Sequence, residues 1–341
     1  MELSEPILIW GAGAIGGTLG AYFIRAGHRV IFVDSAGEHV NAINQRGLNI
    51  TGPVAEFAVQ AEAFTPERLN GRFSTTFLCV KAHHTKAAIA ELAKHLEPEG
   101  FVVSAQNGLN EIEIAEGVGK ERTVGCFVNF GADYLEPGCI HYGGRGAVVV
   151  GELDGELSPR LNALHRLMKE FDDQALATDN IWGYLWGKMA YGAQLFATAL
   201  TDASIAEALA APEHHRLFAE LAREVLRVAA ARHVRPEGFN GFDPQAFMPD
   251  TPPEAARRSL EGMAAHNRKS AKSHSGIWRD LAVRKRKTEV DAQLGPVVSI
   301  GRQLGVATPI TARLIEMIHQ IENGSRKLDW GNLAELERVL L

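Results

Sequence analysis

The glycine-rich segment near the start of the chain constrains the fold more than any other feature. Ile7-Leu8-Ile9-Trp10 is an unbroken apolar run, typical of a strand buried on both faces, and it leads into Gly11-Ala12-Gly13-Ala14-Ile15-Gly16. Residues 17–26 then have helical spacing and are followed by Gly27, at a position suited to a helix C-cap. A strand, a G-x-G-x-x-G turn and a helix in this order predict a Rossmann dinucleotide-binding unit.

An acidic residue follows at the distance that such a unit requires. Asp34 comes directly after the second predicted strand, residues 29–33, and lies 23 positions after Gly11 (34 − 11). A carboxylate there accepts hydrogen bonds from the adenosine ribose and repels a 2′-phosphate, and the next four residues contain no Arg or Lys. We therefore predict NAD as the cofactor in preference to NADP. An Asp at a strand end is also compatible with a simple turn.

The remainder of the chain separates into two halves of different pattern. In the first half we predict further strands at 76–80, 102–105, 123–130 and 146–151, with a helix at 85–95. From residue 181 we predict helices at 185–209, 215–232, 290–304 and 311–322, and an irregular loop at 236–253. The expected fold is an α/β N-terminal Rossmann domain with a parallel twisted sheet, residues 1–178, followed by an all-α C-terminal domain, residues 179–341.

Composition and charge narrow the class of protein. The formal net charge of −6 argues against a nucleic-acid-binding protein, since such proteins carry a basic surface. The run Arg284-Lys285-Arg286-Lys287 is compatible with attraction of an anionic substrate or a cofactor phosphate. Three widely spaced cysteines indicate neither a disulfide framework nor a zinc site. The longest apolar stretch, 189–200, is shorter than the ~20 residues of a membrane helix. We expect a cytoplasmic protein without metal or membrane partner, and the apolar C-terminal helices are compatible with a homodimer.

Five further segments, taken with the glycine-rich turn, carry a resemblance to a known family. They are Val80-Lys81, Gln106-Asn107-Gly108, Leu185-Trp186-Gly187-Lys188, Thr288-Glu289-Val290-Asp291 and Gly305-Val306-Ala307-Thr308-Pro309. In their order and spacing, from Ile7 to about Val339, the chain resembles the ketopantoate reductases (2-dehydropantoate 2-reductases). The resemblance implies a C-terminal domain like that of 6-phosphogluconate dehydrogenase, and hydride transfer between a nicotinamide cofactor and C2 of a 2-oxo acid.

The resemblance also implies roles for individual residues. Lys188 is the catalytic acid, and Glu289 lies near the nicotinamide ribose as a second catalytic residue. Asn107 contacts the nicotinamide side of the cofactor, and Lys81 lines its cleft. The chemistry of Lys188 is reasonable in its own right, because an ammonium group stabilises the charge that develops on a ketone oxygen during hydride addition and can donate the proton. A purely structural role stays open for three of these residues. Lys188 is compatible with a lysine at the edge of a packed helix, Asn107 with an Asn-Gly turn, and Glu289 with an ion pair to the preceding basic run.

Two departures from the family pattern concern the substrate. Gly192 stands where the family has an asparagine four residues after the catalytic lysine, and Ser273-His274-Ser275-Gly276 replaces Asn-x-Ser-Ser. We predict that Gly192, His274 and Ser275 bind the substrate, a small branched or hydroxylated 2-oxo acid or its 2-hydroxy partner, although His274 is equally compatible with helix capping. The alternatives are a true NADPH-dependent 2-dehydropantoate 2-reductase of pantothenate biosynthesis and a non-catalytic dinucleotide-binding sensor.

Overall fold

The structure is a computed structural model that describes residues 2–268 and 273–340. The chain divides into two units, Met1–Ile181 and Trp182–Leu341. The division lies three residues after the predicted boundary at 178 (181 − 178). Among the residues described, no helix is both long and apolar enough to cross a membrane.

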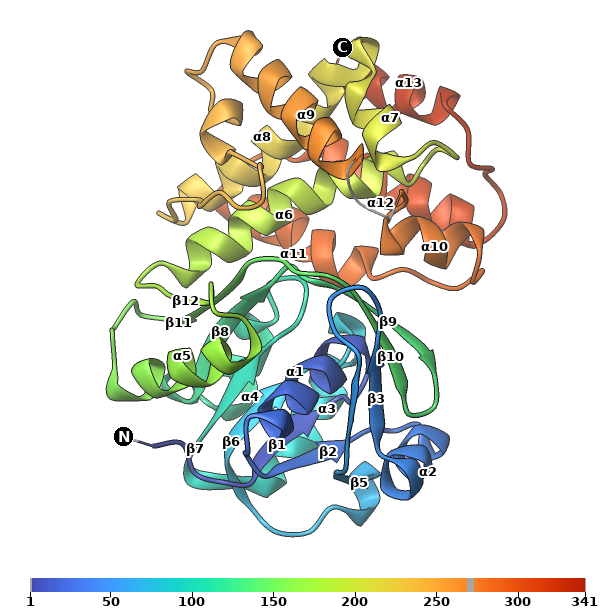
Figure 1. Ribbon diagram of the computed structural model, residues 1–341. Coiled ribbons are helices and arrows are strands. Elements are labelled where there is room, and N and C mark those ends of the chain that lie inside the picture. Colours follow the sequence, from blue (N-terminus) through green and yellow to red (C-terminus); the bar gives the residue numbers. More distant parts are fainter. Residues whose placement is uncertain (1, 269–272, 341) are drawn as a thin grey trace. The chain divides into compact units, whose positions relative to one another are not determined.

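An eight-stranded sheet forms the centre of the first unit (Figure 1), with the strand order β12-β11-β8-β7-β6-β1-β2-β5. Its strands are β1 (Ile7–Trp10), β2 (Val30–Val33), β5 (Glu62–Phe64), β6 (Phe73–Leu78), β7 (Leu96–Ser104), β8 (Thr123–Val128), β11 (Val148–Glu152) and β12 (Leu176–Ala177). β1 runs parallel to both of its neighbours, β2 and β6, as the Rossmann prediction requires. The predicted parallel sheet is confirmed at every pair but one, because β11 runs antiparallel to β8.

Helices cover both faces of this sheet, which explains the apolar run of β1. Because successive side chains of a strand point to opposite faces, Ile7 and Ile9 pack in one core and Leu8 and Trp10 in another. The first core includes residues of α1 (Ala14–Arg25) and α5 (Pro159–Phe171). The second core includes residues of α3 (Thr85–Leu92) and α4 (Glu111–Val118). Every residue of β1 is therefore buried.

A second, four-stranded sheet was not predicted. Its order is β4-β3-β10-β9, and its strands are β4 (Phe57–Val59), β3 (Leu48–Thr51), β10 (Cys139–Gly144) and β9 (Gly131–Glu136). Helix α1 contacts strands of both sheets. Gly17 allows this close approach, because a Cβ at its position would overlap Ile140 of β10. The hairpin of β9 and β10 is thereby fixed against the helix that begins at the glycine-rich turn.

The second unit is helical, as predicted. Its helices are α6 (Ile181–Thr198), α7 (Ile205–Ala210), α8 (His215–Ala231), α9 (Pro253–Arg268), α10 (Gly276–Ala282), α11 (Val290–Leu304), α12 (Pro309–Glu322) and α13 (Gly331–Glu337). The single helix expected over 185–209 is wrong, because the chain leaves α6 and restarts as α7. A capping box starts α7: the Ser204 hydroxyl accepts the Glu207 N–H at 3.2 Å, and the Glu207 carboxylate accepts the Ser204 N–H at 2.8 Å.

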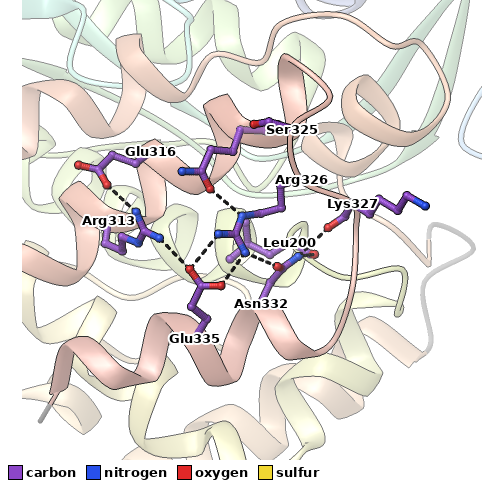
Figure 2. A network of polar contacts seen from close by, with 9 residues as sticks. Leu200, Arg313, Glu316, Ser325, Arg326, Lys327, Asn332 and Glu335 are labelled. Atoms are coloured by element: carbon purple, nitrogen blue, oxygen red, sulfur yellow. Dashed lines mark hydrogen bonds and ion pairs between the residues drawn. The ribbon is translucent and has the colours of Figure 1, made fainter.

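A polar network ties the C-terminal helices together, and Figure 2 shows it from close by. Arg326 donates two hydrogen bonds to the Glu335 carboxylate, at 2.8 and 2.9 Å, and Arg313 donates a third at 2.7 Å. Asn332 accepts a hydrogen bond from Arg326 at 2.6 Å and donates one to the carbonyl of Leu200 at 2.8 Å. The network therefore joins α12, α13 and the segment that follows α6.

Candidate active site

The glycine-rich turn is shaped by its contacts with the end of β6. Gly11 has a φ of +102°, and a Cβ there would lie 2.7 Å from the Val80 nitrogen and 2.8 Å from the Cys79 carbonyl carbon. A Cβ at Gly16 would overlap the carbonyl oxygen of Gly11. Both positions therefore require glycine, since the neighbouring atoms belong to the backbone and cannot swing away.

Gly13 differs from its two neighbours in the motif. A Cβ at Gly13 would meet no atom within 4 Å, so the space beside this residue is open. Gly13 is also the N-cap of α1, where no described side chain caps the helix and no acidic residue occupies the first turn. The first N–H groups of a helix have no partner within the helix and carry a partial positive charge. This end of α1 therefore suits the pyrophosphate of a dinucleotide.

Two side chains stabilise the turn by hydrogen bonding to the backbone N–H and the carbonyl oxygen of Ala12. Asp34 accepts the Ala12 N–H at 2.9 Å with one carboxylate oxygen and the Ala36 N–H at 2.9 Å with the other. His39, which lies in α2 (Gly37–Arg46) and is 1% exposed, places Nε2 2.8 Å from the Ala12 carbonyl oxygen. Asp34 thus forms a turn after β2, which is the structural role considered for it above, and it also supports the glycine-rich segment. Each of its oxygens retains a lone pair for a ribose hydroxyl.

Lys81 and Asn107 follow the ends of β6 and β7, at the same edge of the parallel sheet as the glycine-rich turn and Asp34. Asn107 is exposed and Lys81 is half-buried. In open sheets of this kind ligands bind outside the carboxyl ends of the strands. The predicted cofactor residues of the first unit therefore gather along one edge, in four neighbouring strands.

A buried amide network supports the loops that carry Lys81 and Asn107. Gln106, 4% exposed, donates through Nε2 to the carbonyl of Val80 at 2.8 Å and to the Thr85 hydroxyl at 2.9 Å. The Thr85 hydroxyl donates to Asn110 Oδ1 at 3.1 Å, and Asn110 donates to the carbonyl of Asn107 at 2.8 Å. Gln106 belongs to a motif quoted above, but Thr85 and Asn110 carried no local signal for this role.

In the second unit, Lys188 lies in the middle of α6. Lys188 is half-buried, and Trp186 and Met189, close to it in the helix, are buried. Gly187 is required beside it, because a Cβ there would overlap the carbonyl oxygen of Glu237. Gly192 follows Lys188 by four residues and so lies on the same face of α6. A Cβ at Gly192 would meet nothing within 4 Å, so one turn from Lys188 this face of the helix borders open space.

An aromatic cluster adjoins the same segment of α6. The ring of Tyr191 lies 5.7 Å from that of Phe239 and 5.8 Å from that of Phe242, both of which are buried. Burial raises the pKa of Tyr191, against a smaller effect of its hydrogen bond with Asn267, so its hydroxyl stays protonated at neutral pH. Tyr191, next to Gly192 in the chain, is thus packed against aromatic side chains.

The other predicted residues of the second unit lie at helix N-termini. Ser275, 5% exposed, caps α10 by accepting the Trp278 N–H at 3.1 Å. His274 has its Nδ1 2.8 Å from the Ser273 hydroxyl and its Nε2 3.3 Å from the Asp202 carbonyl oxygen, and its ring lies 4.0 Å from that of Trp278. Glu289 is half-buried at the N-cap position of α11. Ser275, and not His274, is thus the capping residue.

Both units of the chain match one protein family. Residues 7–155 match the family model described as ketopantoate reductase PanE/ApbA, and residues 180–322 match the model of the C-terminal part of the same family. A 2-dehydropantoate 2-reductase of Archaeoglobus fulgidus is 28% identical over 322 residues, which are 94% of this chain and 99% of the relative. One from Streptococcus pyogenes is 25% identical over 318 residues, 93% of this chain and 97% of the relative.

Solved structures share the fold over nearly the whole length. The ternary structure of D-mandelate dehydrogenase with NADH and anilino(oxo)acetate has a TM-score of 0.80 at 22% identity, covering 93% of this chain and 98% of that one. A PanE/ApbA family ketopantoate reductase from Ralstonia eutropha has a TM-score of 0.76 at 24% identity, covering 93% and 98%. At these identities the structures establish the fold alone.

Proposed function

The chain belongs to the ketopantoate reductase PanE/ApbA family, and from this premise we propose that it is an NAD-preferring reductase of a small 2-oxo acid, or a dehydrogenase of the 2-hydroxy partner. As a family member it is an oxidoreductase that uses a nicotinamide cofactor and acts on CH–OH groups. One observation supports the preference for NAD: the Asp34 carboxylate follows β2 and accepts the Ala12 N–H of the glycine-rich turn, and a carboxylate at this position of a Rossmann unit suits an unphosphorylated ribose.

The proposed mechanism divides the work between the two units. When bound, the reduced nicotinamide supplies a hydride to C2 of the 2-oxo acid. The α1 N-terminus holds the pyrophosphate, and Asn107 and Glu289 orient the nicotinamide end. Lys188 donates a hydrogen bond to the C2 oxygen, stabilises the negative charge that develops there, and transfers the proton. In the oxidative direction Lys188, as the neutral amine, accepts the hydroxyl proton.

Two observations favour different substrates within this class. The curated relatives are named 2-dehydropantoate 2-reductases, which favours the NADPH-linked reaction of pantothenate biosynthesis. The open space at Gly192 favours an acid with a bulkier group attached to C2, and one similar structure is a mandelate dehydrogenase with NADH. We propose that the open space at Gly192 decides the choice, so a bulkier branched or aryl 2-oxo acid is the better substrate.

Steady-state assays separate these candidates. Oxidation of NADH and of NADPH is followed with 2-dehydropantoate, 2-oxoisovalerate and benzoylformate, on wild type and on Gly192→Asn. The asparagine fills the open space, so we expect kcat/KM for benzoylformate to fall about tenfold, the cost of crowding a pocket by a group of this size, and that for 2-dehydropantoate to fall less or rise. A wild-type enzyme that uses 2-dehydropantoate with NADPH alone refutes both the substrate and the cofactor proposals. Tight NADH binding without turnover of any 2-oxo or 2-hydroxy acid supports the sensor alternative instead.

A further inference from the structure

The β9–β10 hairpin of the second sheet is joined to the glycine-rich turn by His39. The Gly138 N–H, between the two strands, donates to His39 Nδ1 at 3.0 Å, and His39 Nε2 lies 2.8 Å from the Ala12 carbonyl oxygen. Because Nδ1 accepts the Gly138 N–H, Nε2 is the ring nitrogen that donates to the Ala12 carbonyl. The buried His39 ring therefore bridges the hairpin and the turn and fixes their relative position.

Tyr134 of β9 contacts His39 and is partly exposed to solvent. Its ring packs edge-on against His39, with the ring centroids 5.0 Å apart and the planes at 73°. At 38% exposure it is one of the few large aromatic side chains that the described surface presents. Tyr134 pairs with Ile140 and Glu136 with Cys139, so Leu135 is an extra residue in β9, a β-bulge. Bulges commonly re-aim a neighbouring side chain.

Tyr134 is linked to Asp34 through the glycine-rich turn: its ring contacts His39, His39 contacts the Ala12 carbonyl, and Asp34 accepts the Ala12 N–H. Partial burial raises the pKa of the Tyr134 phenol, and the carboxylates of Asp34, Glu38 and Glu136 raise it further. The phenol therefore stays a neutral hydrogen-bond donor at physiological pH. These contacts bring Tyr134 to the same turn as Asp34, although the two residues lie 100 positions apart in the chain (134 − 34).

We propose that Tyr134 forms one wall of the adenosine subsite, with Asp34, Glu38 and Glu136 as a negative rim. An exposed aromatic face beside a ribose-binding carboxylate suits a purine nucleoside, because every base offers a π face for stacking. The three carboxylates admit a ribose with free hydroxyls and repel a 2′-phosphate. The inference rests on the dinucleotide site of the proposed function, but it is independent of the substrate.

Fragments of the cofactor test this subsite without turnover. Dissociation constants for ADP-ribose, 2′-phospho-ADP-ribose and nicotinamide mononucleotide are measured by calorimetry on wild type, Tyr134→Ala, Tyr134→Phe and Leu135→Ala. We expect Tyr134→Ala to weaken ADP-ribose about tenfold, a typical loss for one base–aromatic stack, and to leave nicotinamide mononucleotide unchanged. Tyr134→Phe keeps the ring and should stay within about threefold of wild type. Leu135→Ala removes an exposed apolar side chain from the same hairpin and is the matched control.

A second variant tests the rim separately and does not depend on the folding of Tyr134→Ala. Glu38→Gln with Glu136→Gln removes two exposed charges, and we expect about a tenfold gain in affinity for 2′-phospho-ADP-ribose from the reduced repulsion, with little change for ADP-ribose. Unchanged ADP-ribose affinity in Tyr134→Ala, or an equal loss of both cofactor halves, would overturn the proposal for the wall, and an unchanged 2′-phospho-ADP-ribose affinity would overturn the rim. Failure of the wild type to bind ADP-ribose at all would instead overturn the dinucleotide site of the proposed function.

Discussion

Gly13 and Gly16 are three residues apart in one motif, yet their surroundings give them different tasks. A Cβ at Gly16 overlaps the backbone of Gly11, whereas a Cβ at Gly13 meets nothing within 4 Å. We expect Gly16→Ala to lower the free energy of unfolding by about 2–3 kcal/mol, as overpacking against backbone does. Gly13→Ala should leave stability within about 0.5 kcal/mol but weaken NADH binding at least about tenfold, because the methyl group occupies the path of the pyrophosphate.

Urea denaturation and fluorescence titration with NADH measure the two effects. Wild type and the two alanine variants are compared under one set of conditions. The Gly16→Ala variant serves as the control for Gly13→Ala, since both add one methyl group to the same turn. An equal loss of stability in the two variants would contradict the packing assigned to Gly16, and full NADH affinity in Gly13→Ala would show that the turn does not hold the pyrophosphate.

Asp34 combines a structural and a recognition role, and a substitution should expose both. Asp34→Ala removes the acceptors of the Ala12 and Ala36 N–H groups together with the proposed ribose contact and the repulsion of a 2′-phosphate. We expect the ratio of kcat/KM for NADH to that for NADPH to fall about 10- to 100-fold, since one or two charge-assisted hydrogen bonds are lost, and the melting temperature to fall as well. Steady-state kinetics with both cofactors test this. A ratio that does not change would mean that Asp34 is only a turn former.

At the scale of elements, the α12–α13 network makes stability depend on pH. Arg326, and then Arg313, lower the pKa of Glu335 from its ordinary 4.5 to about 2. The folded state therefore binds this proton less readily than the unfolded state, so the contribution of Glu335 is complete above about pH 4.5 and is lost as the pH falls towards 2.

Glu335→Gln keeps the shape of the side chain and removes its charge. Because the carboxylate is 36% exposed, solvent screens the pairing, and we expect a loss of only about 1 kcal/mol in the free energy of unfolding at pH 7. The difference from wild type should shrink between pH 4.5 and pH 3. Urea denaturation across this range measures it. A difference that stays constant with pH would contradict the assignment of the charge to the network of Figure 2.

Local patterns predicted the Rossmann core because each of its elements carries a signal of its own. The apolar run of β1, the glycine-rich turn and the helical spacing of α1 lie within 20 residues. The second sheet carries no such signal, since its strands have three to six residues and β9 is largely exposed. The break between α6 and α7 did leave a signal, the S-x-x-E box of Ser204 and Glu207, which the apolar pattern around it concealed.

The same distinction applies to the candidate site. The glycine-rich turn and Asp34 follow a fixed local spacing, so they were candidates from the sequence alone, and their roles in cofactor binding stay a prediction. His39 and Gly138 are 99 positions apart, and the hairpin meets the turn only through tertiary packing. His39 is a buried histidine in a polar helix and Tyr134 is an exposed tyrosine on a short strand. The local sequence pattern does not distinguish either of them from a residue without a functional role. The positions of His39 and Tyr134 beside the turn are therefore visible only in the folded structure.

At the scale of the whole molecule, the proposed functions are divided between the units. The glycine-rich turn, Asp34 and Asn107 belong to the first unit, and Lys188 belongs to the second. Cofactor binding and proton donation should consequently be separable by mutation. In a sensor that had lost its chemistry, Lys188 would contribute to neither turnover nor transition-state stabilisation.

The most direct test of the account is turnover by Lys188→Ala at saturating NADH with the best 2-oxo acid of the panel. We predict that kcat falls about 10²- to 10⁴-fold, the usual cost of removing a general acid, while the dissociation constant for NADH stays within about threefold of wild type. Lys327→Ala, which removes an exposed lysine side chain from the same unit, is the control and should retain full activity. Turnover by Lys188→Ala at the wild-type rate would contradict the central claim that Lys188 is the catalytic acid.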